Sequence, residues 1–125
     1  MKIHKMEDVM KENQIKIPNS TIKLSVKDRI VIRQLFPNES DIVTQLMVRD
    51  IIEKTEFTQE EIEKINLKVN EKGYTWDPQA KEKEVDFTKA ELEFLKSRVD
   101  EWDKKKRITQ DILDLCVKIK DVRLS

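Results

Sequence analysis

The stretch INLKVNEKGYTWD, residues 65–77, decides the fold class, because here the spacing of apolar residues changes from a helical period to that of a strand. Apolar and polar residues alternate along 65–69 and again along 74–76, which is typical of half-buried strands. The same alternation returns at Val85 and Phe87. The sequence therefore predicts three short strands, which we expect to form an antiparallel β-meander.

NEKG, residues 70–73, is typical of a hairpin turn and holds the only glycine of the chain. Two registers are open. A three-residue loop pairs Asn70 with Tyr74 and makes Tyr74 and Trp76 an aromatic surface for a ligand. A four-residue loop pairs Val69 with Tyr74 and places the apolar side chains on one face, buried against helices. We favour the four-residue loop, because burying a large side chain contributes about 1.5–3 kcal/mol and a non-ideal turn typically costs less.

Five helices are predicted around these strands, three before them and two after them. Each begins at a serine or threonine that can cap a helix N-terminus, namely Ser25, Ser40, Thr58, Thr88 and Thr109. Two of these caps form capping boxes, Thr58 with Glu61 and Thr88 with Glu91. The predicted fold class is therefore α+β: a helical domain of about five helices with an inserted three-stranded antiparallel β-meander.

The helix predicted after Ser40 carries the widest apolar stripe of the chain, so we expect it at the centre of the core. The stripe comprises Ile42, Val43, Leu46, Met47, Ile51 and Ile52. In the last helix Cys116 lies among apolar residues and is interpreted as a small buried hydrophobe. A lone cysteine forms no internal disulfide.

The N-terminal segment differs from the rest of the chain. Residues 1–20 carry apolar residues at helical spacing and then break at Pro18. We interpret them as an arm, either an oligomerisation element or a frayed terminus. Residues 21–125 have the length of one α+β domain.

The charge of the chain is high but balanced. Charged residues make up 40% of the sequence, and 25 basic residues match 25 acidic ones, so the net charge is zero. Opposite charges are interleaved, which argues against a surface that binds nucleic-acid phosphates. One local excess is basic, and we interpret it as a solvated helix terminus, with a nucleic-acid patch as the alternative. It consists of Lys104, Lys105, Lys106 and Arg107.

The sequence lacks the residues that several common kinds of functional site require. With one glycine the chain has no phosphate-binding loop, and with one cysteine and one histidine it has no zinc site of the usual type. The many carboxylates are typical of a solvated surface. We therefore expect no enzyme, no cofactor and no metal. No apolar run approaches the ~20 residues that span a bilayer, and no secretory signal is apparent, so we expect a cytoplasmic protein.

The order KLSVKDRIVIRQLFP, FTQEEIEKINLKVN, YTWD and EVDFTKAELEFLKSRVDEWDKKKRIT resembles small uncharacterised proteins of bacteriophages and prophages. In those proteins an sVRDRLxxxxLLP opening, an EE helix, a strand ending in TW and an LT before the last helix recur. The resemblance covers roughly residues 21–120. It implies a fold and a viral origin, hence the host cytoplasm, but no activity and no site residues.

Three functions follow from these patterns. The first is a non-catalytic interaction protein that binds a host or viral protein, with aromatic and arginine anchors. The candidate anchors are Tyr74, Trp76, Phe36 and Arg33.

The second function is a small-molecule binder that sequesters a nucleotide signal. Tyr74 and Trp76 would stack on the base, and Lys68 and Lys72 would pair with phosphate. The third function is a virion or replication accessory protein that contacts nucleic acid through residues 104–107. We favour the first, and a homo-oligomer formed through residues 1–20 is a further expectation.

Overall fold

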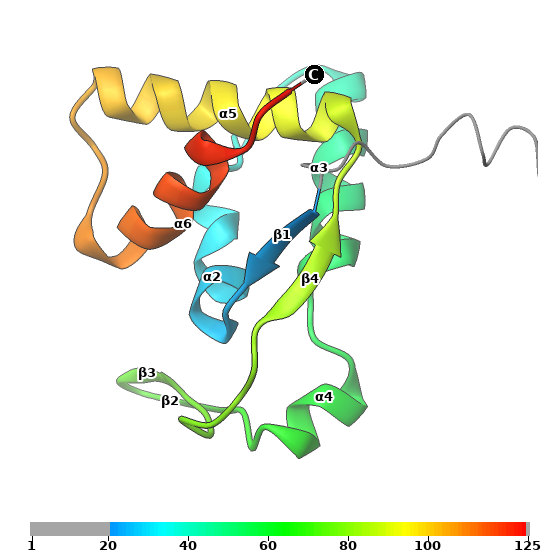
Figure 1. Cartoon of the computed structure of the whole chain (residues 1–125), viewed down its shortest axis with the longest axis vertical. Coiled ribbons are helices and arrows are strands. Elements are labelled where there is room, and N and C mark those ends of the chain that lie inside the picture. Colours follow the sequence, from blue (N-terminus) through cyan, green and yellow to red (C-terminus); the bar gives the residue numbers. More distant parts are fainter. Residues whose placement is uncertain (1–20, 125) are drawn as a thin grey trace, which may run out of the picture.

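The structure is a computed structural model that describes residues 21–124 (Figure 1). In chain order its elements are β1 (Thr21–Leu24), α2 (Val26–Val31), the 3-10 helix η1 (Ile32–Leu35), α3 (Ile42–Thr55), α4 (Gln59–Lys64), β2 (Lys68–Asn70), β3 (Gly73–Thr75), β4 (Lys83–Asp86), α5 (Lys89–Lys104) and α6 (Gln110–Asp121). The α+β class and five α-helices are confirmed within this range. The predicted arm at residues 1–20, with its oligomerising role, lies outside it.

The strands form two separate two-stranded sheets, so the predicted three-stranded meander is wrong. β2 pairs with β3, whereas β4 pairs antiparallel with β1, with Ile22 opposite Val85. The sequence reading missed β1, whose Ile22 and Leu24 are both buried. The chain turns at 77–80, where the Ala80 amide donates to the Asp77 carbonyl oxygen (3.0 Å), before it enters β4. β4 therefore pairs with β1, and Val85 of β4 is buried in the core together with Ile22 of β1.

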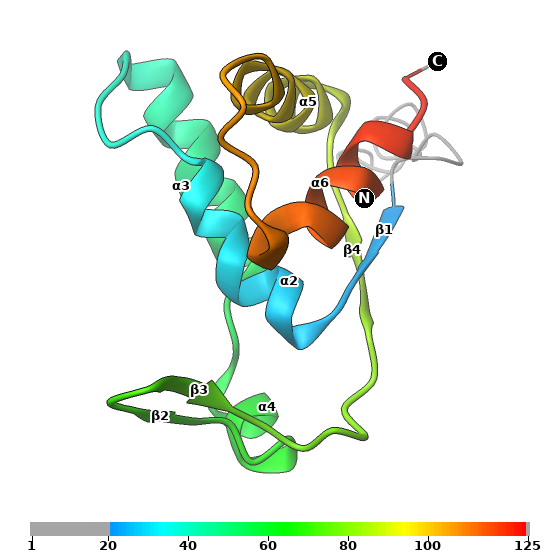
Figure 2. The same cartoon turned by 90° about the vertical axis from the view of Figure 1, so that its left-hand side faces the viewer.

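The core lies where α5 and α6 pack beside the β1–β4 sheet and α2 (Figure 2). Its fully buried side chains are Leu24, Ile32, Leu35, Ile51, Leu92, Leu95, Val99, Ile112, Leu115 and Ile119. Cys116 is buried among them, as predicted. We call β1, α2, η1, β4, α5 and α6 the body of the molecule.

α3 borders the core and does not form its centre, which corrects the sequence-based expectation. Val48, Ile51 and Thr55 are its buried residues, and they share one face of the helix. The side chains of Ile42 and Val43 are 78% and 68% exposed, and Leu46 is exposed as well. The apolar stripe is wider than the surface that the body offers, so the first two turns keep an apolar face in solvent. The N-cap is Asp41, one residue after the predicted Ser40.

Residues 56–82 form a second region, which we call the hairpin lobe. It contains α4 and the β2–β3 hairpin, and both views place it at one end of the molecule (Figures 1 and 2). Val69 pairs with Tyr74, as the favoured register predicted, but Asn70 also pairs with Gly73, so the loop has two residues and not four. The burial expected from that register is wrong, because Val69 is 71% and Tyr74 49% exposed. The long helices α5 and α6 pack against other elements of the body and do not cover this face of the hairpin.

Candidate functional site

A groove of about 360 Å³ separates the hairpin lobe from α2 and η1 of the body. We call it the hairpin groove. It is lined by Arg29, Ile30, Arg33, Glu56, Phe57, Ile62, Leu67, Val69 and Tyr74. Because its two walls come from the two regions of the molecule, its shape depends on how firmly the lobe is held.

The lobe wall of the groove is apolar. Val69 and Tyr74 lie directly opposite each other in the hairpin, and the alternation of strand side chains places Leu67 on the same face. Ile30 forms part of the opposite wall and packs on the core from the body. A ligand in this groove would contact aliphatic and aromatic surface on both sides.

Arg29 also lines the groove and is only 5% exposed. Its Nε donates to the Thr55 carbonyl oxygen (3.0 Å), and Nη2 donates to the Glu56 carbonyl oxygen (2.7 Å). Nη1 and Nη2 also donate to the two carboxylate oxygens of Glu61 (2.8 and 3.1 Å). The guanidinium carbon lies 4.0 Å from the ring centre of Phe57. Arg29 is therefore committed to holding the lobe on α2 and is not a free ligand for a partner.

Glu61 is the partner of Arg29 on the hairpin lobe, and we call this ion pair the Arg29–Glu61 junction. The Arg29 hydrogen bonds lower its pKa from 4.5 to about 2, against the opposing effect of burial and with smaller help from the Thr58 amide and Lys83. The same carboxylate completes the predicted capping box, since it accepts from the Thr58 amide (3.0 Å). One side chain thus caps α4 and joins the two regions, and it stays ionised at neutral pH.

Arg33 and Glu56 form the charged rim of the groove. Their side chains approach to 4.0 Å, and both are about half exposed. An exposed ion pair of this length contributes little to stability. Arg33 is therefore available to exchange Glu56 for an acidic group of a ligand.

The structure brings together two of the six predicted binding residues, Tyr74 and Arg33. Phe36 packs against the core, and Trp76 is half-buried outside the groove lining. Lys68 alternates with Val69 and so points to the opposite face of the hairpin. Lys72 lies in the turn. The cation that accompanies Tyr74 is accordingly Arg33 and neither of the two lysines.

Sequence reasoning missed Phe57 and Ile62 as site residues, although a signal for them exists. Phe57 precedes the Thr58 N-cap, and Ile62 occupies the fourth helical position, which is the arrangement of a hydrophobic staple. Both side chains line the groove. Arg29 was missed as well. Its partners, Thr55 and Glu61, are too distant in the sequence for local patterns to predict these contacts.

The predicted basic patch surrounds the C-terminal end of α5. Lys105 pairs with Glu101 (3.3 Å), and the Arg107 guanidinium stacks over Trp102 at 5.1 Å. Lys106 has a positive φ of 56°, and its amide donates to the Asp103 carbonyl oxygen (3.0 Å). These contacts are those of a helix C-terminus, which is the interpretation that the sequence favoured.

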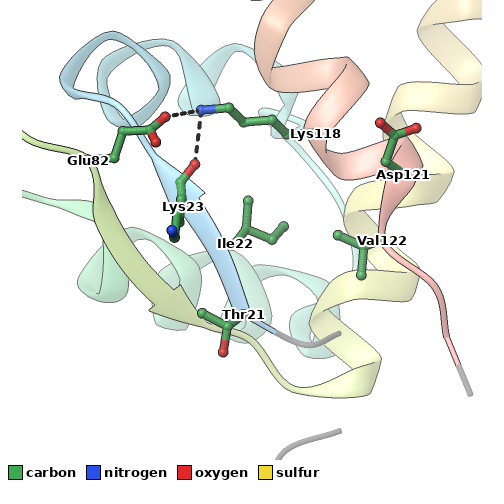
Figure 3. A pocket seen from close by; sticks show the side chains of 7 residues that line it. All are labelled: Thr21, Ile22, Lys23, Glu82, Lys118, Asp121 and Val122. Atoms are coloured by element: carbon green, nitrogen blue, oxygen red, sulfur yellow. Dashed lines mark hydrogen bonds and ion pairs between the residues drawn. The ribbon is translucent and has the colours of Figure 1, made fainter. Parts of the chain in front are cut away.

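A second pocket, of about 350 Å³, lies beside the outer edge of β1 and the end of α6 (Figure 3). Lys118 spans it and donates to Glu82 (2.7 Å) and to the Lys23 carbonyl oxygen (2.9 Å). Lys118 also donates to the buried Asp28 (2.6 Å). Burial alone would lower the pKa of Lys118, but the hydrogen bonds to Asp28 and Glu82 outweigh it and raise the pKa. This lysine joins α6 to β1 and α2.

Over residues 21–124, no three side chains of His, Cys, Asp or Glu come together in a way that could hold a metal ion. None of the helices in that range combines the length and the apolar character that crossing a membrane requires. Comparison of the chain with protein-family models, with curated proteins and with solved structures gave no match.

Proposed function

We propose that this chain is a non-catalytic interaction protein, encoded by a bacteriophage or prophage, that binds a host or viral protein through the hairpin groove. The observation that carries the proposal is the exposed pair Val69 and Tyr74, held opposite Ile30 and Arg33 in one groove. The viral origin is supported by the resemblance of residues 21–120 to phage-encoded proteins.

The groove favours a particular kind of partner. An aliphatic or aromatic side chain would fill the space between Val69, Tyr74 and Ile30, and a neighbouring carboxylate would pair with Arg33. Tyrosine and arginine are enriched among the residues that dominate binding energy at protein interfaces. Because Arg29 already holds the lobe, less free energy is needed to order the groove when a partner binds.

The buried polar groups of the structure support a binding role over a catalytic one. Within residues 21–124 the buried polar residues are Asp28, Arg29, Thr55 and Glu91, and each contacts another element or caps a helix. Glu91, for example, accepts from Lys54 (2.6 Å) and from the Thr88 amide (2.9 Å). Thr55 donates to the Ile51 carbonyl oxygen (2.8 Å) within α3. These groups act in structural hydrogen bonds, which leaves surface shape as the source of function.

The proposal is tested with the tagged full-length chain as bait in a bacterial host lysate, followed by mass spectrometry of the captured proteins. Val69→Asp and Arg33→Glu should each abolish capture of one partner without lowering the melting temperature, because both side chains are largely exposed. Thr75→Asp and Lys68→Glu are the matched controls, since both residues are exposed and pair with each other on the opposite face of the hairpin. These controls should capture the partner as the wild type does.

Capture that all four variants leave unchanged would contradict the proposal. The affinity for a purified partner gives a second measure, since Tyr74→Ala should weaken it roughly thirtyfold, as expected for an aromatic anchor worth about 2 kcal/mol.

One observation also favours a small-molecule ligand, namely that an aromatic ring and a cation share the groove. Heating the purified protein and analysing the released compounds by mass spectrometry distinguishes the two functions. A nucleotide that wild type releases and Tyr74→Ala does not would replace the protein partner as the ligand of the groove.

A further inference from the structure

The first two turns of α3 carry an apolar surface that no other element within residues 21–124 covers. We call it the α3 ridge, and it consists of Ile42, Val43 and Leu46, all exposed. A shallow depression of about 440 Å³ runs along it. Contiguous apolar surface on a folded chain marks an interaction site more often than a scattered apolar side chain does.

Two charges of opposite sign flank the ridge at its two ends. Arg49 lies one turn after Leu46 on the same helix face, and Glu39 lies just before the helix N-terminus. Both are exposed, and neither has an ion-pair partner among residues 21–124. The nearby Asp41 differs, because it caps the helix through the Thr44 amide (3.2 Å) and hydroxyl (2.6 Å). The ridge therefore ends in one free cation and one free anion within the described chain.

We propose that the α3 ridge binds a second copy of this chain, with two α3 helices packed antiparallel around a two-fold axis at the level of Thr44. In a two-fold contact each pair of residues occurs twice. The register that sets Ile42 opposite Leu46 of the copy also brings Arg49 towards the segment that precedes α3 of the copy, where Glu39 is exposed. The apolar surfaces then cover each other, and both unpaired charges gain a partner.

The charged residues on the exposed face of α3 also favour the antiparallel arrangement over a parallel one. Beyond Leu46 the exposed positions are charged, at Arg49, Asp50 and Glu53. A parallel copy in register would set Arg49 against Arg49 and Glu39 against Glu39. The antiparallel arrangement avoids this repulsion and also aligns the two helix dipoles favourably.

The proposed dimer leaves the hairpin groove open. The start of α3 and the hairpin lobe lie at opposite ends of the molecule (Figure 2). The inference is therefore independent of the proposed function, and either can fail without the other.

Sedimentation velocity over a range of concentrations tests the inference on the full-length chain. The wild type should shift with concentration towards twice the 14.9 kDa mass of the chain. Glu39→Arg and Arg49→Glu should each raise the dissociation constant at least about tenfold, since each sets like charges against each other at both ends of the contact. Glu93→Arg, at an exposed position of α5, is the matched control and should dimerise as the wild type does.

Mixing the two variants gives the decisive result. In a mixed dimer both charge pairs become attractive again, so Glu39→Arg and Arg49→Glu should associate with each other although neither associates with itself. A wild type that stays at the monomer mass throughout, as when residues 1–20 or a different protein cover the ridge, overturns the inference. A dimer that neither substitution weakens overturns it as well, and so does a mixture that remains monomeric.

Discussion

The body and the hairpin lobe are held together by different forces, although they belong to one chain. In the body, α5 and α6 contribute Leu95, Ile112, Leu115 and Ile119, which are all 0% exposed. In the lobe, no residue of α4, β2 or β3 is buried. The lobe depends instead on a capping box, the Arg29–Glu61 junction and a hydrogen bond from the Asp77 amide to the Ile65 carbonyl oxygen (2.8 Å).

This difference has a functional consequence. Binding surfaces are drawn from the less stable parts of proteins, where apolar side chains remain accessible. The lobe can present Val69 and Tyr74 because its position is fixed by polar contacts and not by burial of its apolar face. The comparison can be tested in each region separately.

The largest expected effect is in the body. Leu115→Ala should lower the free energy of unfolding by about 3–5 kcal/mol, because it opens a cavity in the core. Leu113→Ala on the same helix is the control, since Leu113 is exposed and its loss should cost less than about 1 kcal/mol. Urea denaturation measures both. Similar losses at the two positions would show that α6 does not bury the face that carries Leu115.

An intermediate effect is expected at the junction. Glu61→Gln should destabilise by on the order of 3 kcal/mol at neutral pH, the value that corresponds to a pKa lowered from 4.5 to about 2 in a side chain 27% exposed. Amide hydrogen exchange should rise in residues 58–77 before it rises in the body. Glu60→Gln is the control, because Glu60 is exposed in the same turn of α4 and should change little.

The pH dependence of this difference identifies its cause. The folded-state pKa of Glu61 lies below its unfolded value, so the carboxylate stabilises the fold fully above pH 4.5 and loses this contribution as the pH falls towards 2. The difference between wild type and Glu61→Gln should therefore shrink over that range. A difference that stays constant from pH 6 to pH 2 would rule out ionisation of Glu61 as its origin.

The smallest effect is expected on the exposed face of the lobe. Tyr74→Ala should change the free energy of unfolding by less than about 1 kcal/mol, because the side chain is half exposed among the described residues. Thermal denaturation measures the change. A loss of several kcal/mol would mean that the ring is buried and would remove the groove as a binding surface.

The features predicted correctly from the sequence are local ones. The capping boxes at Thr58 and Thr88 form as expected, because each joins groups only three residues apart. The predicted pair of Val69 and Tyr74 is also correct, although the burial that was expected to favour it is absent from the described residues. Tyr74 and Arg33 were also identified as candidate binding residues, but the sequence did not predict that they line the same groove.

The sequence by itself therefore determined the start of four of the five α-helices among residues 21–124 and the α+β class of the chain. Tertiary structure decided the contacts between distant residues. It paired β4 with β1 across 65 positions, from Thr21 to Asp86, and it joined Arg29 to Glu61 across 32. It also selected which face of α3 is buried. An apolar pattern shows that a surface can be buried. The core, however, has room for only some of the apolar surfaces, so the packing of all elements together decides which surface stays exposed.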